Sequence, residues 1–205
     1  MIRHQTAQVH VSVVMRGLAA LSDVREWIFC PGMMFLDVEK WWGDSGLRLR
    51  AHEGLDLLLY ADHQGKVCQL NETSPIPVLG NGVILCIIPD FLGRSIIVEH
   101  TLPKEGSGRL YSIYAHTCPG NEVRAGMAMR EGDILGTVAG PHGSPFPMAP
   151  HLHVSVGWTP APVPSGRLNW DTIADPDVLN LLDPLAVMDC RYRAEKDDVT
   201  PCRAL

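Results

Sequence analysis

The feature that most constrains the fold is an alternation of short apolar runs with turn-forming residues between positions 52 and 156. Glycine and proline supply 35 of the 205 residues (19 Gly and 16 Pro), so strands joined by many turns are favoured over long helices. We predict a mainly β fold, an antiparallel sandwich or barrel-like structure with minor helices. The predicted strands are 55–60, 82–88, 95–99, 110–116, 134–139 and 152–156.

The chain length suits one domain with flanking segments, because domains usually span about 100–200 residues. We assign residues 46–190 to that domain. Residues 1–45 are predicted to form an N-terminal appendage of unknown role, in which 9–13 alternates like a strand and 18–29 predicts a short helix. Residues 191–205 are polar and predict a C-terminal tail.

The composition excludes several classes of protein. A net charge of -6 argues against a nucleic-acid partner, which requires a basic face. The sequence contains no run of about 18 apolar residues, so it predicts no transmembrane segment. His10 and Arg16 interrupt the stretch that comes nearest to a signal peptide, so no signal peptide is predicted. The six cysteines show no CxxC spacing, which argues against a structural zinc knuckle; Cys190 and Cys202 bracket the polar tail and are candidates for a disulfide.

The first candidates for chemistry are two histidines, His153 in the predicted strand 152–156 and His151 directly before that strand. In an extended strand His151 and His153 point to one face, whereas Leu152 and Val154 point to the other. Such a strand suits the floor of a metal cleft. The alternative interpretation is two ordinary half-exposed histidines, and HxH taken alone is weak evidence for a metal.

A histidine and an aspartate four residues apart form the second candidate. In a straight strand the Cα atoms of His52 and Asp56 would lie about 13 Å apart, too far for shared zinc ligation through bonds of about 2.0–2.2 Å. The segment must therefore bend if both residues bind one ion, and Gly54 permits a bend. A surface turn with incidental polar residues is the alternative interpretation.

The third candidate is His116, at the end of the predicted strand 110–116. Strand alternation places His116 on the same face as Ser112 and Tyr114. Taken alone, a histidine at a strand end is more often structural than catalytic.

Together the three motifs follow an order that points to a known family. HxxxD, a strand-end histidine and HxH, on a β-rich chain, resemble the M23 (lysostaphin/LytM-type) zinc metallopeptidases. The resemblance covers about 52–156 and includes the segments 96–100 and 130–136, and 183–185 resembles the short closing motif of the family. It implies the family's β fold, with loops walling a groove.

The resemblance also implies roles for individual residues. His52, Asp56 and His153 would be ligands of one zinc ion, and His116 and His151 would be the catalytic, non-ligand pair. The implied activity is that of a zinc metalloendopeptidase acting on peptidoglycan stem or cross-bridge peptides. The implied location is periplasmic, envelope-associated or secreted, although no signal peptide is visible. A helix-borne HExxH glutamate is absent from the sequence.

The sequence departs from the family at several places. The approach to HxH, 140–150, is long and proline-rich, and 44–51 lacks the tyrosine that some members place before the first ligand. That role is either unfilled or taken by Tyr60, Tyr114 or another group. Residues 1–45 would make a latent enzyme if they covered the cleft and supplied a fourth ligand, for which the candidates are His4, His10 and Asp23.

Two other functions compete with the peptidase. A non-catalytic relative would bind peptidoglycan or activate another hydrolase, but such relatives usually lose ligands or histidines, and all five positions are filled here. The segment 123–139 resembles one hairpin of a lipoyl- or biotinyl-carrier domain. The chain's lysines, however, do not lie in the turn context that attachment needs.

Trp41 and Trp42 are expected to pack in the core or at a rim rather than to contact substrate.

Overall fold

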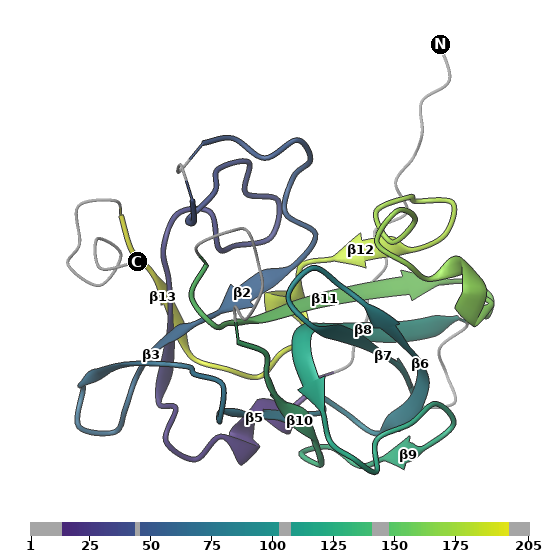
Figure 1. The fold of residues 1–205 in the computed structure, drawn as a ribbon, viewed down its shortest axis with the longest axis horizontal. Coiled ribbons are helices and arrows are strands. Elements are labelled where there is room, and N and C mark those ends of the chain that lie inside the picture. Colours follow the sequence, from purple (N-terminus) through teal and green to yellow (C-terminus); the bar gives the residue numbers. More distant parts are fainter. Residues whose placement is uncertain (1–13, 44–45, 103–107, 141–147, 197–205) are drawn as a thin grey trace.

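The computed structural model describes residues 14–43, 46–102, 108–140 and 148–196. Over these residues it contains thirteen strands in two sheets and three short 3₁₀ helices, and the sheets do not close into a barrel (Figure 1). The prediction of a mainly β fold is confirmed. Within the same ranges no helix has the length and hydrophobicity needed to span a bilayer.

The larger sheet carries the candidate site. Its main path runs β12–β11–β8–β7–β6–β9, and β2, β10 and β5 join it from the side; all its pairings are antiparallel. Its strands are β2 (Leu55–Leu57), β5 (Pro75–Pro77), β6 (Gly82–Pro89), β7 (Arg94–His100), β8 (Arg109–Pro119), β9 (Ala128–Met129), β10 (Ile134–Val138), β11 (Leu152–Thr159) and β12 (Asn180–Leu182). Every predicted strand is present, and 55–60 divides between the two sheets.

The smaller sheet has the order β13–β1–β3–β4, with β1 parallel to β13. Its strands are β1 (Glu26–Phe29), β3 (Leu59–Ala61), β4 (Val67–Gln69) and β13 (Tyr192–Ala194). The prediction of a helix over 18–29 is wrong: a 3₁₀ helix, η1 (Gly17–Ala20), precedes strand β1. Pairing with β3 and burial of three consecutive side chains of β1 override the local helix signal.

The described parts of both chain ends pack against the central residues. Trp27 and Ile28 of β1 belong to the same core cluster as Leu55 and Leu57 of β2. Residues 192–194 of the predicted tail form β13 beside β1, so they are ordered in a sheet rather than free. The predicted strand 9–13 lies outside the described residues. The two remaining 3₁₀ helices are η2 (Ser165–Arg167) and η3 (Pro184–Ala186).

A buried polar chain connects strands β7 and β8 of the larger sheet with the loop after β5. His100 Nδ1 lies 3.3 Å from the Asn81 carbonyl oxygen, and its Nε2 lies 2.7 Å from Ser112 Oγ. Ser112 Oγ bonds to the Tyr114 hydroxyl at 2.9 Å, and that hydroxyl accepts the Leu79 N–H at 2.7 Å. Burial lowers the pKa of His100 to about 4, so the imidazole is neutral at pH 7.

This histidine makes folding stability depend on pH. In the unfolded chain the imidazole titrates near pH 6.5, whereas in the folded protein its pKa is about 4. Between these values the unfolded state binds more protons, so we expect stability to fall by up to about 3 kcal/mol as the pH drops from 7 to 4. Urea unfolding in the presence of a chelator measures this slope.

The variant His100→Gln should flatten this part of the profile, because the titrating group is gone. The control is His63→Gln, which removes an exposed histidine and should keep the wild-type slope. An unchanged slope in His100→Gln would contradict the assignment.

Candidate metal centre

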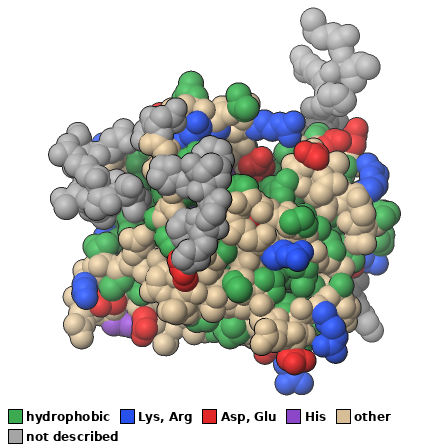
Figure 2. Space-filling view, in the orientation of Figure 1, with side chains coloured by type: hydrophobic (Ala, Val, Ile, Leu, Met, Phe, Trp, Pro, Cys, Tyr) green, Lys and Arg blue, Asp and Glu red, His purple; other side chains and the backbone are tan. Residues whose placement is uncertain are grey.

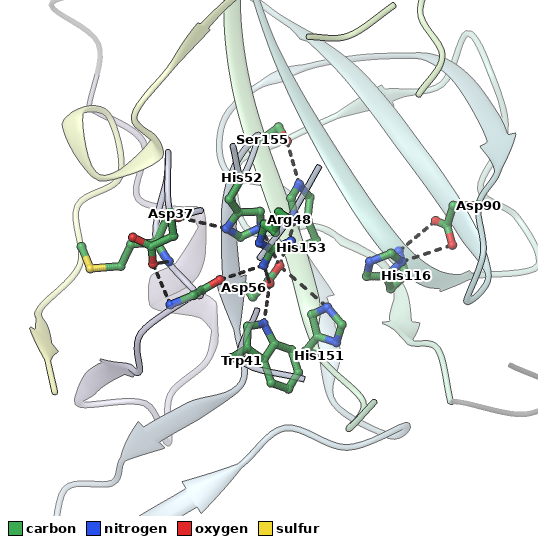
Figure 3. Close-up of polar contacts among 12 residues, drawn as sticks. Asp37, Trp41, Arg48, His52, Asp56, Asp90, His116, His151, His153 and Ser155 are labelled. Atoms are coloured by element: carbon green, nitrogen blue, oxygen red, sulfur yellow. Dashed lines mark hydrogen bonds and ion pairs between the residues drawn. The ribbon is translucent and has the colours of Figure 1, made fainter. Parts of the chain in front are cut away.

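The register between β2 and β11 places an aspartate directly opposite a histidine. His153 of β11 pairs with Asp56 of β2, flanked by the apolar pairs Leu152–Leu57 and Val154–Leu55. Directly opposite residues of an antiparallel pair share a face, so the carboxylate and the imidazole point to the same side of the sheet (Figure 3). Two of the three predicted ligands are therefore brought together by strand pairing alone.

The loop before β2 brings His52 to the same point, through a close backbone approach at Gly54. A Cβ atom on Gly54 would lie 2.2 Å from the Val154 carbonyl oxygen and 2.8 Å from Ser155 Oγ. Gly54 is not among the glycines with positive φ. The sequence argument for a glycine here is therefore modified: the position requires space against β11 rather than an unusual backbone conformation.

Three ligand atoms form a small triangle. The distances are 3.1 Å from His52 Nε2 to Asp56 Oδ1, 3.0 Å from His52 Nε2 to His153 Nδ1, and 2.9 Å from His153 Nδ1 to Asp56 Oδ1. Ligand atoms around a tetrahedral zinc at about 2.0–2.1 Å lie about 3.3 Å apart, close to these edges. All three side chains are buried, at 1 %, 3 % and 5 % exposure in sequence order.

The hydrogen bonds of the outer ring nitrogens of His52 and His153 determine whether the inner nitrogens present lone pairs to the triangle. His52 Nδ1 lies 3.0 Å from the Met34 carbonyl oxygen, which only accepts, so Nδ1 carries the proton. His153 Nε2 lies 2.8 Å from Ser155 Oγ and can donate to it. With these protons outside, two nitrogen lone pairs and a carboxylate oxygen converge within 3.1 Å. Such a donor set fits a small divalent cation.

The second carboxylate oxygen of Asp56 is held by two donors that the sequence did not reveal. Trp41 Nε1 donates to Asp56 Oδ2 at 2.7 Å, and Arg48 Nη2 lies 3.4 Å from the same oxygen. Burial by itself raises the pKa of Asp56, but the facing His52 and His151 help to hold that pKa well below its ordinary value. The group is therefore a carboxylate with Oδ1 turned to the triangle. Trp41, expected to be packing, also bonds to a predicted ligand.

His151 lies beside the triangle without joining it. Its Nδ1 lies 2.9 Å from the Ala149 carbonyl oxygen and therefore carries the proton, and its Nε2 lies 3.7 Å from Asp56 Oδ1. The ring meets the indole of Trp41 edge-on at a centroid distance of 4.9 Å. Burial lowers the pKa of His151 to about 3, so the ring is neutral with a lone pair on the inner nitrogen.

His116 reaches the site through a kink in β8. Ala115 pairs with His153, so regular alternation would turn His116 to the opposite face, together with Tyr114. His116 instead has φ 61°, and its ring centroid lies 4.8 Å from that of His151 and 6.1 Å from that of His153. The predicted common face of His116 and Tyr114 is wrong, because alternation holds only for extended backbone.

These side chains surround a cavity of about 260 Å³. Aromatic and apolar groups from separate loops complete its wall, and the sequence carried no spacing signal for them. The lining residues are Trp42, Arg48, His52, Glu53, Asp56, Phe91, His116, Met148, His151, His153 and Trp170.

Several proposed participants lie elsewhere. Tyr60 and Tyr114 do not line the cavity, and the Tyr114 hydroxyl is bonded to Leu79 N–H. Asp23 is exposed and outside the ligand group, while His4 and His10 lie outside the described residues. Cys190 carries a free thiol, so the predicted disulfide between Cys190 and Cys202 is wrong. Cys202 itself lies outside the described residues.

Comparison with protein-family models and with curated proteins finds no match to this chain. The resemblance of the motifs to the lysostaphin/LytM-type peptidases therefore stays a prediction, and function is inferred from the site.

On the face in Figure 2, acidic and basic side chains are interspersed and histidine contributes almost nothing, in keeping with the burial of the site histidines.

Substitution of Gly54 tests the close approach to β11. We expect Gly54→Ala to abolish binding of added zinc and to lower stability by at least about 1–3 kcal/mol, because the new methyl group overlaps the Val154 carbonyl. Zinc per chain and the urea midpoint measure the two effects. Gly166→Ala is the matched control, since an added Cβ there meets nothing within 4 Å. Full zinc binding by Gly54→Ala would contradict this geometry.

Removal of the indole donor to Asp56 tests the outer hydrogen bonds. We expect Trp41→Phe to weaken zinc affinity about 10–100-fold, as is usual when a group that orients a ligand is lost. Competition with a chromophoric chelator measures the affinity. Trp158→Phe, on β11 but outside the cavity wall, should bind zinc like the wild type. Equal zinc affinities of Trp41→Phe and Trp158→Phe would show that the hydrogen bond from Trp41 does not contribute to zinc binding.

Proposed function

We propose that this protein is a zinc-dependent metalloendopeptidase of the lysostaphin/LytM type. The observation that carries the proposal is the convergence of three lone pairs, from His52, Asp56 and His153, whose outer atoms are held by hydrogen bonds. Two histidines and one carboxylate leave a fourth position for water or substrate, the layout of a catalytic rather than a structural zinc site. The order of the motifs along the chain supports the same family.

A zinc ion held by these three residues would lower the pKa of water and polarise a peptide carbonyl. The other steps fall to the chain's own side chains. His151 and His116 each donate Nδ1–H to an oxygen outside the cavity, which leaves Nε2 free to accept a proton. One imidazole would take the proton of the attacking water on Nε2, and the imidazolium so formed would pass that same proton to the leaving amine, while the other imidazole would orient the water.

The cavity wall would position the substrate. Trp42, Phe91, Met148 and Trp170 offer apolar surface around the imidazoles, which limits water at the reacting bond. Arg48 is held on the Gly32 carbonyl oxygen at 2.7 Å as well as near Asp56, so it supports the site's shape. The five histidine and aspartate positions and this wall together suit hydrolysis of an extended peptide.

Peptidoglycan stem or cross-bridge peptides are the proposed substrates, on the resemblance of the motifs. The proposed location is periplasmic, envelope-associated or secreted. Cys30 is disulfide-bonded, and such bonds persist in oxidising compartments, which supports this location.

Metal content of single-residue variants tests the proposal. We expect about one zinc per chain in the wild type by elemental analysis. His52→Ala, Asp56→Ala and His153→Ala each remove a ligand and should lose the zinc. His151→Ala and His116→Ala should keep it, because neither imidazole belongs to the ligand triangle.

Digestion of purified peptidoglycan then separates an enzyme from a binding protein. The wild type should release new amino groups, and His151→Ala and His116→Ala should lose about 10²–10⁴-fold in rate. His63→Ala is the control and should digest normally. A protein that binds zinc and co-sediments with peptidoglycan but frees no amino groups would be a non-catalytic relative. Digestion that survives removal of zinc would overturn the proposed mechanism.

A further inference from the structure

The turn between β6 and β7 presents a carboxylate to His116. Asp90 follows β6 directly, and its side chain is fully buried. Oδ1 accepts the N–H groups of Leu92 at 2.9 Å and Gly93 at 2.7 Å, so the carboxylate is locked into its own turn.

The same carboxylate holds both the ring and the backbone of His116. The ring nitrogen Nδ1 lies 3.2 Å from Asp90 Oδ1, and the backbone N–H donates to Oδ2 at 3.0 Å (Figure 3). A carboxylate only accepts, so the proton of a neutral ring lies on Nδ1 and the lone pair of Nε2 is available to the cavity. The backbone bond anchors the residue whose φ of 61° departs from strand geometry.

A second chain of hydrogen bonds ties this carboxylate to the far wall of the cavity. Ser95 Oγ donates to Asp90 Oδ2 at 2.7 Å, and Trp170 Nε1 donates to Ser95 Oγ at 3.0 Å. The indole of Trp170 meets the ring of His153 edge-on at a centroid distance of 5.6 Å. Asp90 is thus linked to a non-ligand histidine on one side and to the packing of a predicted ligand on the other.

We propose that Asp90 is a positioning residue, which sets the Nδ1–H tautomer of His116 and holds its left-handed backbone so that Nε2 faces the cavity. The inference rests on the proposed function for its catalytic meaning, but the geometry of the pair can be tested without any activity. Asp90 itself does not line the cavity, so it acts through His116 rather than on a substrate.

The tautomer is read directly by ¹⁵N NMR of histidine-labelled protein loaded with zinc, at a pH where His116 is neutral. In the wild type we expect a protonated Nδ1 and an unprotonated Nε2 for His116, assigned by the signals missing from His116→Gln. In Asp90→Ala the acceptor is gone, and we expect the Nδ1 proton signal of His116 to be lost while zinc stays at about one per chain. A wild-type His116 protonated only on Nε2 would overturn the proposal.

A second variant keeps the test decisive if Asp90→Ala fails to fold. In Asp90→Asn the amide oxygen can still serve the turn and the ring, but the amide NH₂ faces the backbone N–H of His116. We expect the tautomer to be retained and the His116 amide to exchange its hydrogen at least about 10-fold faster. The matched control is Asp62→Asn, because Asp62 accepts Gln64 and Lys66 N–H groups in a hairpin turn away from the site. Unchanged exchange in Asp90→Asn would overturn the backbone role.

Peptidoglycan digestion by the same variants connects the inference to catalysis. We expect Asp90→Ala to lose about 10–100-fold in rate at unchanged zinc content, and Asp62→Asn to lose nothing. If the wild type has the expected tautomer but does not digest peptidoglycan, the proposed function is wrong and the positioning of His116 by Asp90 still holds. If the wild type is active and Asp90→Ala changes neither the tautomer nor the rate, only the positioning role is wrong.

Discussion

A buried carboxylate opposite a buried histidine on neighbouring strands is the constraint on which the site depends. Charges taken out of water cost several kcal/mol unless they are paired and hydrogen-bonded. Asp56 meets this requirement with Trp41 and Arg48 on one oxygen and imidazoles on the other. Because the outer nitrogens of His52 and His153 bond outward, the inner atoms present lone pairs, and a cation would complete the arrangement.

The site is assembled from segments far apart in the chain. The described part of the N-terminal 45 residues contributes the Met34 carbonyl and the Trp41 indole, which orient His52 and Asp56. This part also adds β1 to the smaller sheet. Loss of these residues would therefore disturb the predicted ligands through their hydrogen bonds, even though none of the three ligands lies within them.

Local rules of structure fail at His116, and the failure has a physical cause. Regular alternation would bury its ring on the Tyr114 face, but a left-handed residue in β8 turns it to the imidazoles. Non-glycine residues in that conformation persist only where surrounding contacts hold them, and such positions concentrate at functional sites. Asp90, Ser95 and the turn after β6 supply those contacts here.

The sequence by itself determined the mainly β class, the six principal strands and the candidates for ligand and proton-transfer residues, because periodicity and residue type are local properties. It did not determine the strand at 26–29, where pairing with β3 overrode a helix signal. Nor did it reveal Trp41, Arg48 and Asp90 as partners of Asp56 and His116. Those contacts join residues 8 to 26 positions apart and depend on how loops and strands pack, so only the tertiary structure decided which oxygen and which nitrogen face the cavity.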